Sequence, residues 1–225
     1  MTFSEKLFKI LIEGGSWKTI LRGLWITIRI SALALMLGTV LGALLCLLRT
    51  RKNPLARGSA SLYVAILRGT PVLMLLLFLY YGVFAGAGLA PVTVATVTFA
   101  LNVSAHVAEL LRSALEASDK GQAEAARSLG FSAWDTFHLI TLPQMLRIAK
   151  PVYQSTIVNL IQWTSVVGYV TITDLTRVIN NTATRTMQPL LTISIGMLIY
   201  LLLSYLVFGV FALTDKRTRK GGEAA

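Results

Sequence analysis

Long apolar stretches alternate with short polar segments along the chain, and five of them approach the roughly 20 residues that an α-helix needs to cross a bilayer. They are residues 20–48, 62–84, 91–111, 151–173 and 189–213. The first is longer than a bilayer requires, so we expect it to tilt or to begin outside the hydrocarbon. The fourth is diluted by polar residues, which are costly at membrane depth unless they face protein or water. The pattern predicts an all-α integral membrane protein with about five transmembrane helices.

Composition strengthens this prediction. The chain has 55% hydrophobic and 14% charged residues and a mean hydropathy of +0.68, which exclude a soluble globular domain. We expect one transmembrane domain at 19–214, an amphipathic segment at 1–18 and a basic tail at 215–225. In the N-terminal segment, apolar residues stand among charges, as in a helix lying on a membrane surface. These apolar residues are Phe3, Leu7, Phe8, Leu11 and Ile12.

Basic residues gather after the first and third apolar stretches and at the C-terminus. They are Arg49, Arg51, Lys52, Arg57 and Arg68; Arg112, Lys120, Arg127, Arg147 and Lys150; and Lys216, Arg217, Arg219 and Lys220. Loop 85–90 has no charge, so the positive-inside rule predicts an external N-terminus and a cytoplasmic C-terminus. Lys6, Lys9, Lys18 and Arg22 weakly oppose this orientation. Anionic lipid at the cytoplasmic ends of the spans explains the net charge of +11 better than nucleic acid does.

The segment 118–146 is a polar loop between apolar stretches. Residues 120–137 place alanines and apolar residues at helical spacing among charges, which predicts a short amphipathic helix. Gly130 permits a bend, and Pro143 is expected to stop any helix that continues from Ile140. The loop should therefore form a helix-turn-helix that protrudes from the membrane.

The same loop resembles the EAA loop of the permease subunits of binding-protein-dependent ABC importers. Glu124-Ala125-Ala126, Gly130, Ile140 and Leu142-Pro143 stand at the spacing of that motif. The resemblance implies a type I importer fold and a cytoplasmic coupling helix that seats in an ATPase subunit. The coupling residues that it implies are Glu124, Ala125, Ala126, Ser128, Leu129, Gly130, Phe131, Leu142 and Pro143. The plainer alternative is a helical loop that only links two spans.

Arg68-Gly69-Thr70-Pro71 is interpreted as an interfacial cation followed by a bend at the entry to the second span. Together with Phe78-Leu79-Tyr80-Tyr81-Gly82 it resembles a segment of the polar amino acid permeases, the branch with histidine and arginine systems. Ala65 departs from that pattern, which often has Glu there. The four residues of the Arg68–Pro71 segment are expected to have a structural role.

Gly38 and Gly42 form a G-x-x-x-G pair in the first apolar stretch. Such a pair permits two helices to approach closely. The motif is common in apolar segments, so it predicts little about function.

In the third stretch, Asn102, His106 and Glu109 share one helical face and are candidates for the substrate pathway. Ionisable residues inside a membrane usually have a functional role. Glu109 either faces a cavity, which would favour a cationic substrate, or pairs with Arg112 one turn later. The segment resembles the family pattern A-Y-x-x-E-x-x-R with His106 in place of Tyr.

In the fourth stretch, the pathway candidates are Gln162, Thr164 and Ser165. The segment retains only the Thr-Ser core of the family pattern K-D-T-S-L, because Gln162 and Trp163 replace its two charged residues. Hydrogen bonding between helices is the alternative role for Thr164 and Ser165. Residues 174–177 resemble the family's outer gate-loop segment, and 85–90 and 174–188 are expected to be outer loops.

The sequence lacks a phosphate-binding G-x-x-x-x-G-K-[ST] motif, H-E-x-x-H and paired cysteines, and its one cysteine, Cys46, lies in the first span. No cofactor, metal or catalytic activity is therefore expected, and energy must come from a separate ATPase chain. We interpret the chain as a multi-pass permease subunit of the bacterial inner membrane that imports a polar or charged amino acid, a class that includes cationic amino acids. Its expected partners are ATP-binding cassette subunits, a second permease chain, identical or related, an extracytoplasmic substrate-binding protein, the amino acid and membrane lipid. The alternative is a non-transporting scaffold that docks a cytoplasmic partner.

Overall fold

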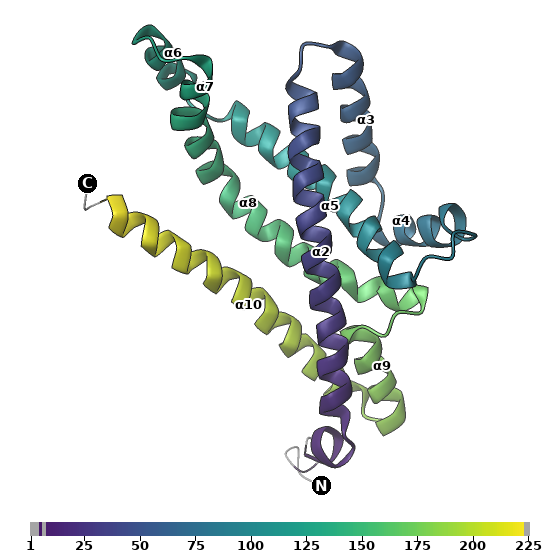
Figure 1. The fold of residues 1–225 in the computed structure, drawn as a ribbon. Helices are drawn as coiled ribbons and strands as arrows, with labels where there is room; N and C mark the ends of the chain where they lie inside the picture. Colours follow the sequence, from purple (N-terminus) through teal and green to yellow (C-terminus); the bar gives the residue numbers. More distant parts are fainter. Residues whose placement is uncertain (1–4, 6–7, 223–225) are drawn as a thin grey trace. The chain divides into compact units, whose positions relative to one another are not determined.

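The computed structural model describes residue 5 and residues 8–222, and every regular element in this part is helical (Figure 1). The helices are α2 (Ser16–Thr50), α3 (Pro54–Gly69), α4 (Val72–Phe78), α5 (Pro91–Glu116), α6 (Lys120–Ser128), α7 (Ala133–Thr136), α8 (Leu142–Trp163), α9 (Leu175–Thr186) and α10 (Pro189–Gly222). Short π segments occupy Lys9–Glu13, Leu79–Val83 and Phe137–Thr141, and a 3₁₀ segment occupies Thr164–Val170. Phe3, Lys6, Leu7 and residues 223–225, which contribute to the predicted N-terminal segment, orientation and tail, lie outside the described residues.

Three described helices are long and apolar enough to cross a membrane: α2, α5 and the Pro189–Leu213 part of α10. A fourth span results if α3 and the segment from Val72 to Val83 are counted as one broken span. The predicted fourth stretch, 151–173, divides between α8 and the 3₁₀ segment. The helices themselves therefore support three or four of the five predicted spans, and they confirm the all-α fold class.

Residue contacts divide the chain into two compact units. Unit 1 comprises Met1–Ala34, Val72–Phe99 and Ile157–Ala225, and unit 2 comprises Leu35–Pro71 and Ala100–Thr156. Unit 1 thus holds α4, α9 and α10, whereas unit 2 holds α3, α6 and α7.

In unit 2, the second half of α2 packs closely on α5 at two glycines. A Cβ atom at Gly38 would lie 2.7 Å from Val103 Cγ1, and one at Gly42 would lie 2.6 Å from Val107 Cβ. Non-bonded carbon atoms do not approach this closely, so a larger side chain would force the helices apart. The glycine pair therefore makes the close helix approach that its spacing permits.

The Arg68–Pro71 segment lies at the break between α3 and α4, so the chain bends where the sequence predicts a bend. Thr70 has an extended backbone (φ −98°, ψ 129°), as expected for a residue that precedes proline. Side chains satisfy carbonyls that the break frees: Thr70 Oγ1 donates to Ile66 O at 2.7 Å, and Asn102 Nδ2 donates to Leu67 O at 3.1 Å. Because these groups have partners, the break is a stable feature of the fold.

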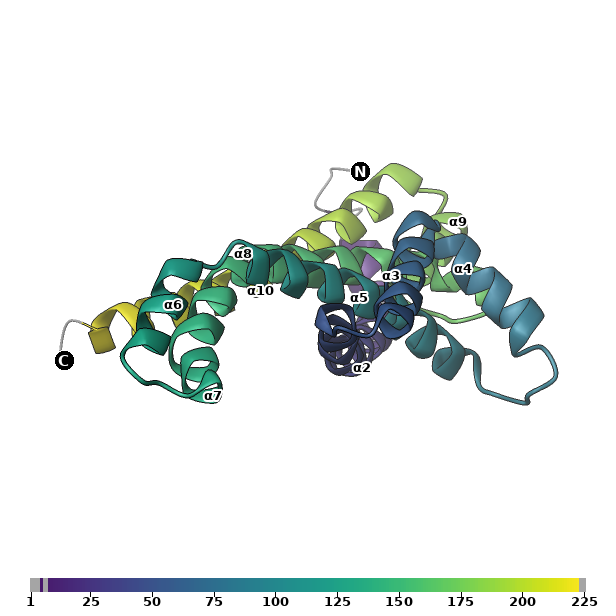
Figure 2. The ribbon, with the colours of Figure 1, turned by 90° about the horizontal axis from the view of Figure 1, so that it is seen from above.

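Unit 1 contains α9 where the sequence analysis predicted an outer loop. Asp174 caps this helix by accepting hydrogen bonds from the backbone N–H groups of Thr176 and Arg177. The helix lies beside the start of α10 (Figures 1 and 2), and its buried residues are Leu175, Val178, Ile179, Thr182 and Ala183. These positions follow a helical period, which the sequence analysis did not use.

Candidate functional site

The loop between α5 and α8 consists of short helices joined by a tight turn at Gly130. The Gly130 N–H donates to Arg127 O and the Phe131 N–H donates to Ala126 O, both at 3.1 Å. This pair of bonds forms a Schellman motif, which needs a residue with positive φ, and Gly130 has φ +90°. The bend predicted at Gly130 is therefore confirmed.

Apolar side chains project from this turn. Leu129 is 80% exposed, Trp134 is 67% exposed, and Phe131 is also exposed. The Trp134 ring stacks on His138 with 4.8 Å between the ring centroids, which holds it in place. A group of exposed apolar residues on a loop is typical of a surface that binds another protein.

The residues predicted to couple with an ATPase differ in exposure. Ala126 is buried and Leu142 is half-buried, and Leu142 packs on a small core of unit 2 that includes Leu110 and Met145. The exposed members are Glu124, Ala125, Ser128, Leu129, Gly130, Phe131 and Pro143. Most of the set is therefore accessible, and Leu142 helps to hold the loop on the core of unit 2.

Pro143 does not stop the helix, contrary to the sequence prediction. α7, the π segment and α8 follow one another without a gap from Ala133 to Trp163. The single helix predicted at 120–137 is instead two helices, α6 and α7, because the turn at Gly130 separates them. Proline normally breaks an α-helix because it lacks an N–H and its ring meets the carbonyl four residues earlier. The π segment widens the turn just before Pro143, and the Leu142 N–H donates to Phe137 O, five residues earlier. The proline is accommodated in the first turn of α8.

Glu109 lies among arginines from three helices of unit 2. Its carboxylate is 2.6 Å from Arg49 Nη1 of α2 and 2.6 Å from Arg112 Nη2 of α5. Arg68 Nη1 of α3 lies 3.7 Å away, and the Glu109 side chain is only 20% exposed. Of the two roles left open by the sequence, the structure supports pairing with Arg112. The argument that Glu109 favours a cationic substrate therefore loses its basis.

Asn102 and His106 share the α5 face with Glu109. Asn102 is buried and caps α3 through its bond to Leu67 O, and its Oδ1 atom has no hydrogen-bond partner among the described residues. His106 is half-buried. Asn102 thus has a structural role at the break after α3, while pathway roles for these two side chains stay predictions.

Gln162 and Ser165 line two neighbouring hollows in unit 1. The larger, of about 420 Å³, includes Gln162, and the smaller, of about 280 Å³, includes Ser165. Thr164 lines neither. It is fully buried, and its hydroxyl donates to Ile161 O at 2.6 Å, so it satisfies the backbone where α8 ends.

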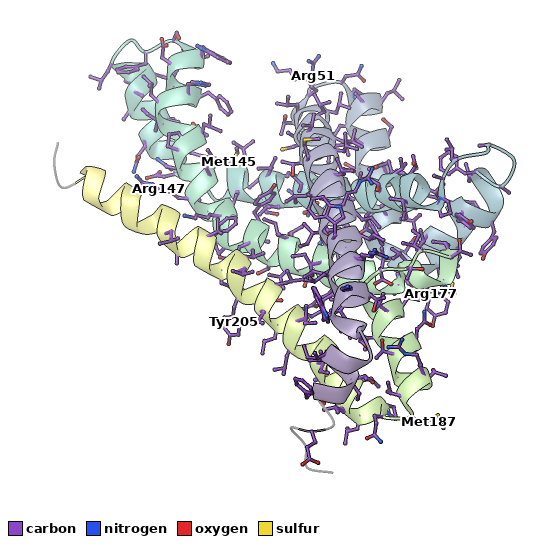
Figure 3. All side chains as sticks on the ribbon, turned by 60° about the horizontal axis from the view of Figure 1, so that its bottom comes forward. Arg51, Met145, Arg147, Arg177, Met187 and Tyr205 are labelled. Atoms are coloured by element: carbon purple, nitrogen blue, oxygen red, sulfur yellow. The ribbon has the colours of Figure 1, made fainter. Side chains whose placement is uncertain are left out.

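Both hollows lie against the polar face of α9, which the sequence analysis did not select. Thr176 and Asn180 line both hollows, and Arg177 (Figure 3) and Asn181 line the smaller one. The Arg177 Nη1 group donates to Gly168 O. No carboxylate among the described residues lies within ion-pair distance of the Arg177 guanidinium. The spacing i, i+1, i+4, i+5 of these four residues could have identified the face.

Asp174 precedes Arg177 by three residues but does not neutralise it. The fully buried Asp174 carboxylate accepts from the backbone N–H groups of Thr176 and Arg177, both at 3.0 Å. Burial raises the pKa of Asp174 above its usual range, and the two backbone donors only partly oppose this effect. The carboxylate caps α9 and leaves the Arg177 side chain to the hollow.

The described residues hold no group of three His, Cys, Asp or Glu side chains arranged as metal ligands. Cys46 is buried and reduced. The polar groups gathered at the two hollows instead suit hydrogen bonding to a small organic molecule.

Comparison with known proteins adds the wider context. A family model described as the inner membrane component of binding-protein-dependent transport systems matches residues 24–220. The probable amino-acid ABC transporter permease protein YckA of Bacillus subtilis is 38% identical over 172 residues, which is 76% of each chain. The histidine/lysine/arginine/ornithine transport system permease protein HisM of Salmonella typhimurium is 28% identical over 219 residues, 89% of this chain and 93% of its own.

A solved amino acid ABC transporter, crystallised with histidines, has a similar fold. The match has a TM-score of 0.83 at 27% identity and covers 92% of this chain and 98% of that one. ATP hydrolysis in such systems belongs to separate ATPase subunits, so the permease is not itself an enzyme. The family match spans most of the described residues, including both units and the loop around Gly130. The chain therefore belongs to the family of binding-protein-dependent transport system inner membrane components, the permease subunits of ABC importers.

Proposed function

We propose that the chain is the permease subunit of an ATP-driven importer that translocates an amino acid delivered by an extracytoplasmic binding protein. The family match over residues 24–220 carries this proposal. The amino acid as substrate is supported by the names of the two relatives and of the solved transporter.

The proposed topology has five spans in a single domain at 19–214, after an amphipathic segment at 1–18. α2, the broken α3–α4 pair, α5, α8 with its 3₁₀ extension, and α10 would each cross the membrane. The N-terminus would lie outside, and the basic residues of 215–225 would lie in the cytoplasm, where anionic lipid attracts them. Helix α10 continues through these residues as far as Gly222.

The proposed coupling element is the turn around Gly130. The exposed Leu129, Phe131 and Trp134 would seat in an ATP-binding cassette subunit, and a second permease chain, identical or related, would complete the pathway. ATP favours the closed ATPase dimer, and contacts at this turn would transmit that preference as outward opening of the permease. The Schellman bonds support this role because they fix the backbone of the turn that presents these side chains.

The first test substitutes Gly130→Ala, which places a side chain at φ +90° and strains the turn by about 1 kcal/mol. We expect amino acid uptake by reconstituted transporter to fall several-fold, and substrate stimulation of ATP hydrolysis to fall with it. The permease should still insert and still co-purify with its ATPase. Gly58→Ala is the matched control, since a Cβ there meets nothing within 4 Å.

Undiminished uptake by Gly130→Ala at normal expression would contradict the coupling role. An ATPase that binds the permease stably, but responds to no amino acid or binding protein even in the unmodified complex, would instead support a docking scaffold.

A further inference from the structure

The two hollows beside α9 contain polar groups that the fold of unit 1 does not use for packing. The apolar residues Leu175, Val178 and Ile179 hold α9 in place, and they form a core cluster with Ile20 of α2. Thr176, Arg177, Asn180 and Asn181 lie outside that cluster. The Thr176 hydroxyl engages Tyr200 and Arg177 Nη1 donates to Gly168 O, which leaves the other guanidinium N–H groups and the two amides to a ligand.

The smaller hollow is suited to a carboxylate. Its lining combines the half-buried Arg177 with the exposed amides of Asn180 and Asn181 and with Ser165. The guanidinium donates to the neutral Gly168 O, and it has no carboxylate partner among the described residues. Arginine presents several N–H donors in a planar fork that matches a carboxylate. A volume of about 280 Å³ is near the lower end of the range for small-molecule sites, which is enough for the polar end of an amino acid.

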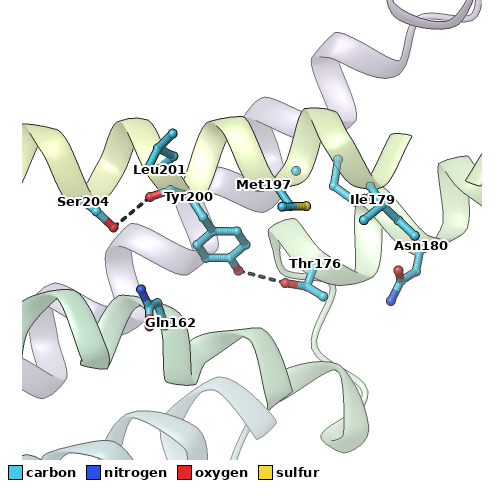
Figure 4. Close-up of a pocket in the computed structure, with 10 residues that line it drawn as sticks. Gln162, Thr176, Ile179, Asn180, Met197, Tyr200, Leu201 and Ser204 are labelled. Carbon is cyan, nitrogen blue, oxygen red and sulfur yellow. Dashed lines mark hydrogen bonds between the residues drawn. The ribbon is translucent and has the colours of Figure 1, made fainter. Parts of the chain in front are cut away.

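The larger hollow is suited to an uncharged side chain (Figure 4). Its apolar wall is formed by Ile179, Ile193, Met197 and Leu201. The Tyr200 hydroxyl is engaged by Thr176 Oγ1 at 2.8 Å, and Ser204 Oγ donates to Tyr200 O at 3.0 Å. Gln162 stands apart from these bonds at the α8 side of the hollow in Figure 4.

None of the described residues that line either hollow is acidic. A buried ammonium or guanidinium without a counter-ion is strongly disfavoured. Glu109 of α5 belongs to unit 2 and is already paired with Arg49 and Arg112. A lysine or arginine side chain would thus find no partner in these hollows.

We propose that the two hollows form one substrate site that binds an amino acid with an uncharged side chain. The carboxylate of the substrate pairs with Arg177 in the smaller hollow, and its side chain occupies the larger hollow beside Gln162. Thr176 and Asn180, which line both hollows, lie where the two parts of the ligand join. This inference rests on the proposed function as an amino acid importer and specifies its substrate class.

The test measures ligand binding to the complete permease–ATPase complex in lipid nanodiscs, without the binding protein. The uncharged probes are L-glutamine, L-methionine and L-leucine, and the charged probes are L-lysine, L-arginine and L-glutamate. For each uncharged probe that binds, its α-amide, which lacks the carboxylate, is the paired ligand. We expect an uncharged probe to bind at least about tenfold more tightly than every charged probe and than its own α-amide, because charge-assisted hydrogen bonds are worth that much.

The decisive variant is Arg177→Gln. It should remove most of the preference for the acid over the α-amide, and Arg177→Lys should restore part of it. Arg185→Gln is the matched control, because Arg185 also lies on α9 but donates to Ser16 Oγ, outside both hollows. A merely structural role of Arg177 would weaken binding of acid and α-amide equally.

Three outcomes would overturn the inference. In the first, a charged probe binds most tightly. In the second, the preference for the acid over the α-amide survives in Arg177→Gln. In the third, the complex binds none of the probes but imports an amino acid when its binding protein is added. In the last case the importer function stands and only the site is wrong. A complex that neither binds nor imports any amino acid would contradict the proposed function itself.

Discussion

Arginines of unit 2 pair with a carboxylate, whereas Arg177 of unit 1 has no carboxylate partner among the described residues. In unit 2, Glu109 engages Arg49 and Arg112 at 2.6 Å, and Arg68 lies nearby. In unit 1, the Arg177 guanidinium donates to a neutral carbonyl, and Asp174 accepts from the Arg177 backbone N–H. The first arrangement compensates charge within the fold. The second leaves a cation that a ligand can compensate.

The difference indicates which charges hold helices together. A carboxylate shared by α2, α3 and α5 fixes three helices, and its loss would leave several cations close together. Arg177 fixes little beyond the end of the 3₁₀ segment at Gly168. A few polar groups that converge on a hollow are typical of binding sites.

The largest effect is expected from Glu109→Gln. Removing the carboxylate leaves Arg49, Arg68 and Arg112 without their shared counter-ion, so unit 2 should lose about 3 kcal/mol of stability. Thermal unfolding of the permease–ATPase complex in lipid measures the loss. Glu116→Gln is the control on the same helix, since Glu116 also pairs with Arg112 but its side chain is 64% exposed, and it should cost less than about 1 kcal/mol. Equal losses in the two variants would show that the Glu109 cluster has no special structural role.

The second prediction concerns how α2 brings Arg49 to Glu109. Gly42 lies about two helical turns before Arg49 on the same side of α2, and a Cβ there would lie 2.6 Å from Val107 Cβ. Gly42→Ala should therefore force α2 from α5 and cost about 1–3 kcal/mol. Gly209→Ala is the control, because a Cβ at Gly209 meets nothing within 4 Å.

A double-mutant cycle with Arg49→Gln sharpens this prediction. If Gly42→Ala already separates Arg49 from Glu109, the two substitutions together should cost less than the sum of their single effects. Thermal unfolding of the two single variants and the double variant measures the coupling. Additive losses would mean that helix spacing and the ion pair are independent.

The sequence was sufficient for the elements whose apolar runs are long. α5 and the Pro189–Leu213 part of α10 match the predicted stretches closely, because a helix that crosses a bilayer needs about 20 predominantly apolar residues. The bend at Gly130 was also predictable, since glycine is favoured where φ is positive. Pro143 misled the prediction because a local π segment, which has no sequence pattern of its own, accommodates it.

The candidate sites depend on contacts between residues distant in sequence. Arg49 and Arg68 fit the positive-inside rule, but nothing local indicates that both approach Glu109. Likewise, the sequence analysis interpreted the α9 segment as an outer loop. Its apolar residues pack on Ile20 and Tyr200 from other helices, and these contacts cannot be read from the sequence. Gln162 and Ser165 were selected from sequence and do line hollows, whereas Arg177 and Asn180 became candidates only when α9 was seen to be a helix.

The smallest effect is expected from Asp174→Asn, which tests whether Asp174 neutralises Arg177 after all. The pKa of Asp174 is raised in the folded protein by burial, so folding favours the protonated form. Its contribution to stability is fully present below the unfolded pKa of about 3.9 and is lost as the pH rises through the higher folded pKa. The substituted asparagine cannot titrate, but its side-chain oxygen can still accept a backbone hydrogen bond. We therefore expect the variant to be within about 1 kcal/mol of the parent at pH 7.

The sign of the pH dependence of stability shows whether Asp174 only caps α9 or also pairs with Arg177. If the carboxylate only caps α9, the parent should gain stability relative to Asp174→Asn as the pH falls toward about 4, near the unfolded pKa. Thermal unfolding of both proteins at a series of pH values down to that point measures the difference. If Asp174 were instead an ion-pair partner of Arg177, its ionised form would be stabilised, and the parent would lose stability relative to the variant on acidification. That opposite sign would mean that Arg177 is compensated within the fold as Arg49 and Arg112 are, and the contrast between the two units would disappear.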